Sequence, residues 1–269
     1  MKPAPFAYLR PESLADAVTA LAGDPGAKVL AGGQSLVPLL SMRLAAPTTL
    51  VDINGLPDLD AITVTDDGVR IGALARHSDV LASDDVRRVQ PLVSLALSHV
   101  AHATIRNRGT TVGSLVHADA AAEMPVVLAL LGGSVDVAGP GGTRTIAASD
   151  LYVGPLETSL AHDEIATSAW FPALAPGGRV AFEEVSRRHG DYALVGVAAV
   201  AEGEAVRVGY VSVSDTPVVV DLTGVAAAEA GDVALGQLDP AGDIHATADY
   251  RAQLVRVLTE RVVKEVTGA

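Results

Sequence analysis

Two glycine-bearing loops constrain this chain of 269 residues more than any other feature. The first loop is AGGQS at residues 31–35, and the second is RNRGTTVGS at residues 106–114. An apolar run at 28–31 precedes the first loop, and a helical pattern at 36–44 follows it. A strand, a glycine turn and a helix expose several backbone N–H groups, and the helix dipole favours an anion there. Two such loops suit a ligand with two phosphates.

Neither loop has a widespread nucleotide-binding signature. The chain has no G-x-G-x-x-G after a strand and no G-x-x-x-x-G-K-[ST], so a Rossmann or P-loop reading is disfavoured. An ordinary tight turn remains the alternative for either loop alone. Gly32 and Gly33 would allow close approach of the backbone to a pyrophosphate, and Gln34 and Ser35 add uncharged donors.

Composition excludes several kinds of chemistry. The chain contains no cysteine, so it supplies no disulfide, thiol nucleophile or thiolate ligand for zinc or an iron–sulfur cluster. The net charge is -13 and no Lys/Arg block occurs, which disfavours a nucleic-acid partner. No apolar run reaches the ~18 residues of a membrane span. The opening residues lack the pattern of a secretory signal, so a cytoplasmic location is expected.

The pattern along the chain predicts three regions. We expect a βαβ-like lobe at 1–55, a second lobe at 56–172 and, after a Pro/Gly-rich linker, a third region at 178–269. The second lobe has a strand at 69–73, helical patterns at 92–103 and 120–131, and a hairpin turn at 139–142. The third region has predicted strands at 180–186, 194–201 and 206–214, and an amphipathic helix at 249–266.

Candidate catalytic and metal-binding groups are missing from these patterns. On a helix over 92–103, His99 and His102 share one face, but no carboxylate or cysteine accompanies them. Solvated or core histidines are the simpler interpretation. We predict no metal site and no catalytic nucleophile, base or triad on this chain.

Several long strings resemble one known family. VLAGGQSLVPLLSMRL and IRNRGTTVGSLVHADAAAEMP are similar to the two flavin-binding signatures of the FAD subunit of molybdenum hydroxylases, the group that contains carbon monoxide, nicotine and xanthine dehydrogenases. The likeness starts at MKPAPFAYLRPESLADAVTAL and continues through IGALARHSDV, DLYVGPLETSLAHDEI and FEEVSRRHGDYALVGVAA to HATADYRAQLVRVLTERVV. It covers almost the whole chain.

The resemblance implies an α+β fold. A two-lobed FAD-binding domain of the PCMH, or vanillyl-alcohol-oxidase-like, type would be followed by a small C-terminal domain with an antiparallel sheet and a helix. FAD would be bound without a covalent link. The residues that the resemblance assigns to FAD in the two loops are Lys28, Val29, Leu30, Ala31, Gly32, Gly33, Gln34, Ser35 and Leu36, and then Thr110, Thr111, Val112, Gly113 and Ser114.

Five further positions match cofactor contacts of the family. Glu123 matches an acidic residue that receives the ribose hydroxyls, although Asp119 and Glu123 also suit capping of a helix start. Ile165 and Ala166 match residues at the flavin edge, with a buried strand as the alternative. Tyr192 matches the aromatic residue that shields one face of the isoalloxazine ring, and otherwise would be a loop residue.

The second loop departs from the family pattern at one position. Relatives tend to have glycine where this chain has Val112. A β-branched residue does not readily adopt positive φ or allow a phosphate to approach closely. The loop keeps its shape only if Val112 has an ordinary φ, with Gly113 carrying the close approach.

The resemblance predicts an electron-transfer subunit. The chain would take electrons from a small iron–sulfur subunit and pass them to an external acceptor, while a large molybdopterin subunit oxidises the substrate. Molybdopterin and 2Fe–2S clusters belong to the partners only. Two alternatives are a stand-alone flavin oxidoreductase of the vanillyl-alcohol-oxidase type and a flavin-free adaptor subunit.

Overall fold

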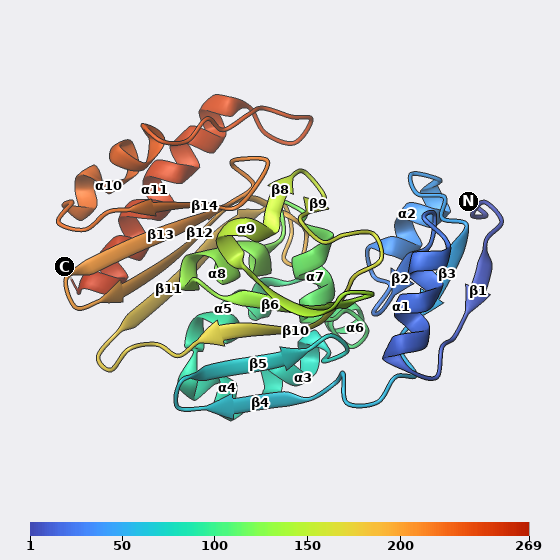
Figure 1. Ribbon diagram of the computed structural model, residues 1–269. Coiled ribbons are helices and arrows are strands. Elements are labelled where there is room, and N and C mark those ends of the chain that lie inside the picture. Colours follow the sequence, from blue (N-terminus) through green and yellow to red (C-terminus); the bar gives the residue numbers. More distant parts are fainter. Residues whose placement is uncertain (269) are drawn as a thin grey trace.

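The computed structural model describes residues 1–268 as three β-sheets and a short hairpin with helices packed around them (Figure 1). The N-terminal lobe holds a parallel sheet in the order β1-β3-β2. Ser13 caps the first helix by accepting a hydrogen bond from the Asp16 amide. The elements of this lobe are β1 (Ala7–Leu9), α1 (Leu14–Gly23), β2 (Lys28–Leu30), α2 (Leu36–Met42) and β3 (Thr49–Asp52).

The middle region is built on a five-stranded antiparallel sheet in the order β4-β5-β10-β6-β7. Its strands are β4 (Ile62–Thr65), β5 (Gly68–Gly72), β6 (Ser134–Gly139), β7 (Gly142–Ala147) and β10 (Ile165–Pro172). β6 and β7 meet at Pro140-Gly141, where Gly142 has a φ of 106°, so the predicted hairpin turn is confirmed. β8 (Tyr152–Gly154) and β9 (Glu157–Thr158) form the separate hairpin.

Seven helices accompany this sheet within residues 1–268. They are α3 (His77–Ala82), α4 (Asp84–Val89), α5 (Pro91–His99), α6 (Ala103–Arg106), α7 (Thr111–His117), α8 (Glu123–Leu131) and α9 (Ala148–Leu151). Seven of the nine α8 residues are buried, because this helix lies between the middle region and the C-terminal sheet.

Two predictions in the middle region need correction, one on the end of a helix and one on the length of a loop. The helix predicted over 92–103 ends at His99, and the chain then turns through Ala101 at a φ of 46°. The Arg106 guanidinium stabilises this turn by donating to the carbonyls of Val100 and Ala101 at 2.8 and 2.9 Å. His99 and His102 therefore do not share a helical face. The second glycine loop is also shorter than predicted, because α7 begins at Thr111.

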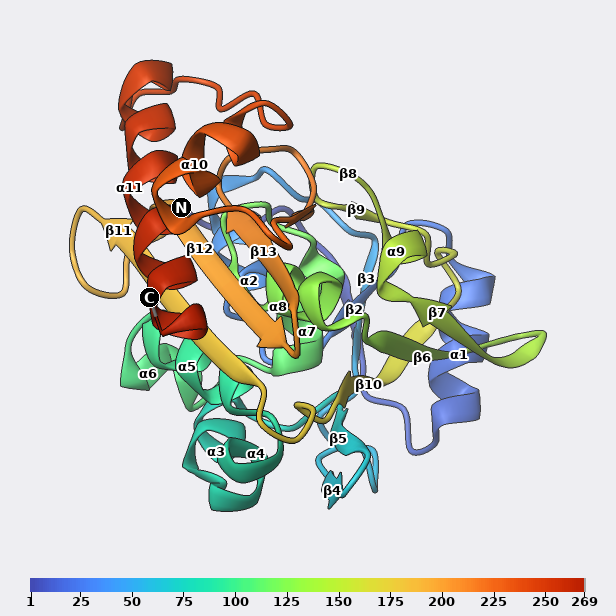
Figure 2. The ribbon, with the colours of Figure 1, turned by 90° about the vertical axis from the view of Figure 1, so that its left-hand side faces the viewer.

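The C-terminal region confirms the predicted antiparallel sheet and long helix. The strands β11 (Arg179–Ser186), β12 (Ala193–Glu202), β13 (Ala205–Val211) and β14 (Val218–Asp221) pair in chain order. α10 (Ala227–Leu235) and α11 (Ala248–Thr267) cover one face, while α5 and α8 pack on the other (Figure 2). Both faces of β12 are therefore buried, and its side chains alternate between two hydrophobic clusters.

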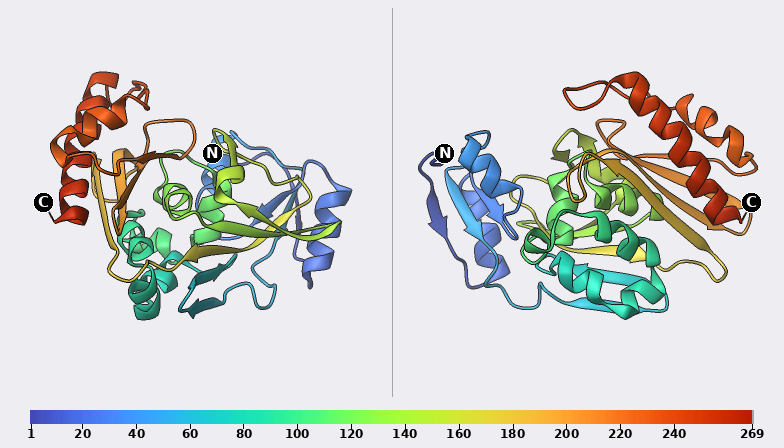
Figure 3. Two further views of the ribbon diagram at one scale, coloured as in Figure 1. Left: turned by 60° about the vertical axis from the view of Figure 1, so that its left-hand side comes forward. Right: turned by 180° about the vertical axis from the view of Figure 1, so that it is seen from behind.

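The three sheets lie in sequence along the molecule. Seen from behind, the N-terminal lobe occupies one end, the C-terminal sheet and helices occupy the other, and the middle region lies between them (Figure 3). Within residues 1–268, no helix combines the length and apolar character needed to cross a membrane.

Candidate functional site

A cleft of about 1390 Å³ opens where the three regions meet. The N-terminal lobe contributes the first glycine loop, and the middle region contributes the second loop and the start of α8. The C-terminal region contributes the start of β12, the residues after β13 and the loop before α11. A typical small-molecule pocket has a volume of ~300–1,000 Å³. The cleft is therefore large enough for an extended ligand such as a dinucleotide.

Most of the residues predicted to bind the cofactor are brought together in this cleft. Those that line it are Lys28, Val29, Ala31, Gly32, Gly33, Gln34, Ser35, Leu36, Thr110, Gly113, Ser114, Asp119, Glu123 and Tyr192. The other predicted residues, Leu30, Thr111, Val112, Ile165 and Ala166, are placed outside the cleft lining. For all nineteen residues, inside and outside the lining, a role in FAD binding stays a prediction.

The first loop presents unpaired backbone donors to the cleft. Among residues 1–268, no protein acceptor receives a hydrogen bond from the amides of Gln34, Ser35 and Leu36. Gly33 adopts a φ of 73°, a conformation that L-residues with a Cβ rarely adopt, and its carbonyl accepts from the Val37 amide at 3.0 Å. The three residues that carry these free amides line the cleft, where backbone N–H groups are available to an anion such as a pyrophosphate.

Gly32 also has a packing role that the sequence did not predict. A Cβ at Gly32 would lie 2.4 Å from the Arg108 carbonyl oxygen and 2.9 Å from the Gly109 Cα. These atoms belong to the backbone of the second loop, which cannot move like a flexible side chain. Gly32 is therefore needed so that the two loops can pack against each other.

Internal hydrogen bonds already use several donors of the second loop. The Thr110 hydroxyl caps α7 by accepting from the Gly113 amide at 3.1 Å. The Thr111 hydroxyl lies 3.2 Å from Nδ1 of His77, and both side chains are buried. Burial lowers the pKa of His77 to about 4, so this histidine is neutral at pH 7. The hydroxyls of Thr110 and Ser114 remain as donors that line the cleft.

The departure from the family pattern at Val112 does not strain the backbone. Val112 is the second residue of α7 and is absent from the positive-φ residues of the described chain. Its side chain is only 1 % exposed and packs in the hydrophobic core. The expected conflict between a β-branched side chain and positive φ therefore does not arise.

The two positions predicted at the flavin edge lie inside the middle sheet. Ile165 and Ala166 begin β10 and pair with β6, next to an irregularity between Ala166 and Ser168. Both side chains are buried in the hydrophobic core. Their environment is that of a buried strand, which was the alternative reading of these positions.

Glu123 is a buried carboxyl group facing the cleft. It is the first residue of α8 and is 6 % exposed. Burial, reinforced by the nearby Glu184 carboxylate, raises the pKa of Glu123 to about 8. Asp119 holds the preceding turn, because its Oδ1 accepts from the Ala121 amide at 2.9 Å. Thus Asp119 braces the turn, while Glu123 has a free acid group beside the ligand space.

We predict that Glu123 makes the cofactor-free chain less stable as the pH rises. The pKa of Glu123 is 4.5, the ordinary value, in the unfolded chain and about 8 in the folded chain. Its contribution to the free energy of unfolding is therefore fully present below pH 4.5 and is lost as the pH rises through about 8. The side chain of Glu123→Gln does not titrate. The melting temperature of this variant minus that of the wild type should therefore be larger at about pH 9 than at about pH 5, by ~2–4 °C for each kcal/mol of unfolding free energy that the wild type loses. An equal difference at both pH values would contradict the prediction.

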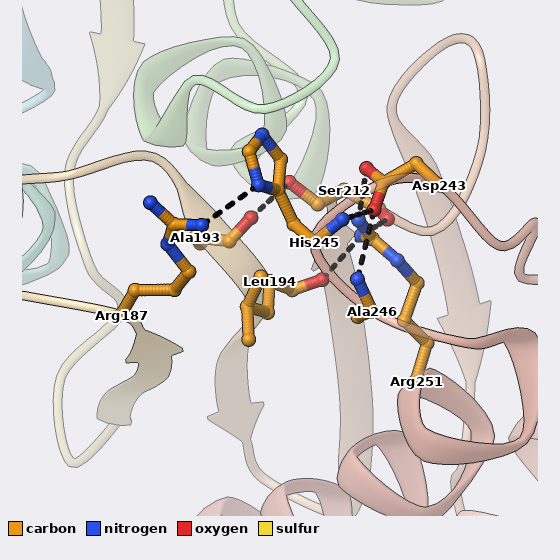
Figure 4. Close-up of polar contacts among 8 residues, drawn as sticks. All are labelled: Arg187, Ala193, Leu194, Ser212, Asp243, His245, Ala246 and Arg251. Atoms are coloured by element: carbon orange, nitrogen blue, oxygen red, sulfur yellow. Dashed lines mark hydrogen bonds and ion pairs between the residues drawn. The ribbon is translucent and has the colours of Figure 1, made fainter.

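The C-terminal wall of the cleft contains residues that sequence reasoning missed. Arg251 on α11 is 6 % exposed and donates to the carbonyls of Leu194 and Ser212 at 2.5 and 2.7 Å (Figure 4). Its Nη2 also donates to Oδ2 of Asp243 at 2.7 Å. Asp243 Oδ1 in turn accepts from the His245 amide at 2.7 Å. Arg251 thus ties the loop before α11 to the end of the sheet.

This anchored loop lies beside the segment that carries Tyr192. Nη1 of Arg187 and Nδ1 of His245 are 3.1 Å apart, which joins the two segments at the mouth of the cleft (Figure 4). Tyr192 is 61 % exposed, so much of its side chain remains available to a ligand. The only sequence sign of the anchor was an arginine on the amphipathic helix, a position that usually faces solvent.

The histidine and acidic side chains of residues 1–268 were also compared with the requirements of a metal site. In the part that the structure describes, residues 1–268, no group of three histidine or acidic side chains is arranged to hold a metal ion. His99 instead lies with its Nδ1 3.3 Å from Oε1 of Glu184, and this hydrogen bond raises the pKa of His99.

Together, the fold and the cleft define a two-loop FAD-binding flavoprotein. Residues 4–174 match the family described as the FAD-binding domain in molybdopterin dehydrogenase, and residues 180–266 match the C-terminal domain of the carbon monoxide dehydrogenase flavoprotein. The chain belongs to this family, as an FAD-binding medium subunit of the molybdenum hydroxylase type.

Characterised relatives cover the chain from end to end. The medium subunit of nicotine 6-hydroxylase from Paenarthrobacter nicotinovorans is 39% identical, with 98% of each chain covered. The carbon monoxide dehydrogenase medium chain of Hydrogenophaga pseudoflava is 31% identical over 98% of this chain and 97% of its own. A chain of quinoline 2-oxidoreductase from Pseudomonas putida 86 has a TM-score of 0.93 at 36% identity, covering 100% of this chain and 99% of its own.

Proposed function

We propose that FAD lies in the cleft with its pyrophosphate against the free amides of the first loop and the hydroxyls of Thr110 and Ser114. The observation that carries this proposal is the set of backbone amides at Gln34, Ser35 and Leu36, which donate to no acceptor among residues 1–268 and belong to residues that line the cleft. Glu123 would accept from the ribose hydroxyls. No cysteine is present, and a non-covalent cofactor suits this donor set.

The proposed role is electron transfer between two partners. A small iron–sulfur subunit delivers electrons, and an external acceptor removes them. FAD supplies the ability to exchange electrons singly or in pairs. The residues of this chain bind and orient the cofactor and restrict water at its ring. Substrate oxidation takes place on a large molybdopterin subunit.

The arrangement of the chain follows the same proposal. We assign residues 1–55 and 56–172 to the two lobes of the FAD-binding domain and residues 178–269 to the C-terminal flavoprotein domain. The hydrophobic clusters support the last division, because one of them is confined to the sheet and helices after residue 180. We also assign the subunit to the cytoplasm, where molybdopterin and iron–sulfur partners would be assembled with it.

A direct test begins with the cofactor content of the purified chain. Acid should release about one FAD per chain, and the oxidised flavoprotein alone should not oxidise an organic substrate. Addition of the iron–sulfur partner in its reduced state should transfer electrons to the oxidised flavin, measured by bleaching of the flavin absorbance in stopped flow. A covalent flavin with substrate turnover would favour the stand-alone oxidoreductase, and a colourless chain that still joins its partners would favour the adaptor.

Tyr192 is predicted to shield the flavin ring. Tyr192→Ala removes an aromatic plate and should weaken FAD binding by roughly 1–3 kcal/mol while increasing the rate at which oxygen oxidises the reduced protein. Tyr192→Phe retains the ring and should behave like the wild type. The measurements are FAD titration and oxygen-dependent reoxidation. If Tyr192→Ala matches the wild type in both, the side chain is simply an exposed loop residue.

A further inference from the structure

The two cofactor loops belong to different parts of the molecule. The first loop follows β2 in the N-terminal lobe, and the second leads into α7 of the middle region. These parts are built on separate sheets, and the N-terminal lobe lies at one end of the molecule (Figures 1 and 3). The distance between the loops therefore depends on contacts between the lobes.

A polar bridge joins the two loops behind the cleft. Nδ2 of Asn54 donates to the carbonyl of Ala31 in the first loop at 2.8 Å. Oδ1 of Asn54 accepts from Nη2 of Arg76 at 2.8 Å, and Nη1 of Arg76 donates to the carbonyl of Arg108 in the second loop at 2.8 Å. Neither Asn54 nor Arg76 lines the cleft. The bridge therefore contacts the loops through their carbonyls, on the side away from the ligand space.

Each half of the bridge is fixed within its own lobe. The Asn54 amide and side chain both donate to Oδ1 of Asp52, at 2.9 and 2.6 Å, and Tyr8 holds the other oxygen of that carboxylate. Arg76 pairs with Thr110 through a backbone bridge. Within residues 1–268, Arg76 forms no ion pair with a carboxylate, so its hydrogen bonds are directed to the two loops and Asn54.

We propose that Asn54 and Arg76 are positioning residues that clamp the two FAD-binding loops at their working distance before the cofactor arrives. Asn54 presents one donor and one acceptor at the same time, and the planar guanidinium of Arg76 presents two donors in a fixed geometry. A ligand that bridges two loops binds more tightly when their separation is already set, because less conformational freedom is lost on binding. This inference rests on FAD occupying the cleft.

The first test measures FAD affinity in the full chain by titration of the cofactor-free protein. Asn54→Ala and Arg76→Ala should each lower the affinity for FAD by about 10- to 100-fold, which is the effect of losing hydrogen bonds that involve a charged group. The double variant should be no weaker than the worse single variant, because each change breaks the same bridge. Fully additive losses would overturn the clamp.

Two further variants separate geometry from charge and from folding. Arg76→Lys retains the charge but lacks the forked guanidinium that reaches both partners, so it should also lower the affinity for FAD. An FAD affinity equal to that of the wild type would overturn the clamp. Arg70→Ala is the matched control, because Arg70 binds Asp136 and Ser168 within the middle sheet and touches neither loop. It should leave FAD affinity unchanged.

A distance measurement tests the clamp without any cofactor. Because the chain has no cysteine, spin labels can be attached at Ala15→Cys on α1 and Ser98→Cys on α5, both exposed positions. Pulsed electron resonance should give one narrow distance distribution for the otherwise wild-type chain and a broader one when Asn54 or Arg76 is replaced. If the distribution is equally narrow with the bridge broken, the clamp does not set the loop distance. If the bridge variants broaden the distance distribution but bind FAD as tightly as the wild type, the clamp is supported and the proposed FAD site is wrong.

Discussion

Gly32→Ala is expected to abolish FAD retention and to lower the stability of the cofactor-free chain. The added Cβ would lie 2.4 Å from the Arg108 carbonyl oxygen and 3.0 Å from the Thr110 amide nitrogen, both backbone atoms of the second loop. The loops must separate to accept it, at a cost of about 1–3 kcal/mol in the folded chain. The same separation widens the gap that the pyrophosphate has to bridge.

The measurement is acid-releasable FAD together with the melting temperature of the cofactor-free protein. Gly23→Ala at the end of α1 is the control, because a Cβ there meets no atom within 4 Å. The control should retain full flavin and should melt at or above the wild-type temperature, since alanine favours a helix. Normal flavin content in soluble Gly32→Ala would refute the packing of the two loops described above.

Arg251→Leu is expected to produce the largest loss of stability, about 3–5 kcal/mol. The side chain satisfies two carbonyls, of Leu194 and Ser212, and pairs with Asp243 in a site where Arg251 is 6 % exposed. Removal of the guanidinium leaves these groups without their partner, and a buried unpaired polar group is costly. The loop that carries His245 should also become more mobile at the cleft.

A second arginine of the same helix provides the comparison. Nε of Arg256 lies 2.6 Å from Oδ1 of Asp232, but the two side chains are 47% and 71% exposed, and such surface pairs contribute ~0–1 kcal/mol. Urea unfolding of Arg256→Ala should therefore resemble that of the wild type. If Arg251→Leu loses no more stability than Arg256→Ala, the anchor has no energetic role. The stability of Arg251→Lys should lie between that of Arg251→Leu and that of the wild type, since lysine retains the charge but cannot make all three hydrogen bonds in the same geometry.

Local patterns predicted many of the single helices and strands, because each of them has its own sequence signal. The C-terminal helix was expected at 249–266 and occupies Ala248–Thr267, since its apolar residues recur at helical spacing. The two strands on either side of Gly203 were also predicted from a local signal, because a glycine turn joins two apolar runs. In the structure these strands pair, and Gly203 has a φ of 62°. The family resemblance added the order of the domains and the cofactor.

Local patterns failed where burial overrides propensity. The Thr-Thr-Val-Gly stretch at 110–113 is a poor helix former, yet α7 begins there because Val112 and Leu115 are buried in the core. The apolar pattern across 92–103 is interrupted without glycine or proline, by a turn that Arg106 holds through two carbonyls. The apolar pattern shows neither the cap that Thr110 provides for α7 nor the hydrogen bonds that Arg106 donates to the turn.

The sequence by itself determined the two glycine loops, the absence of cysteine chemistry and the position of an acidic residue at the start of α8. Tertiary structure alone decided that Gly32 packs against the second loop while Gly33 turns the first. It also decided which distant polar groups meet, as in the pairs Asn54–Arg76 and Asp243–Arg251. The physical reason is that a helix or turn is encoded by neighbouring residues, whereas a hydrogen bond between separate elements depends on how their faces pack.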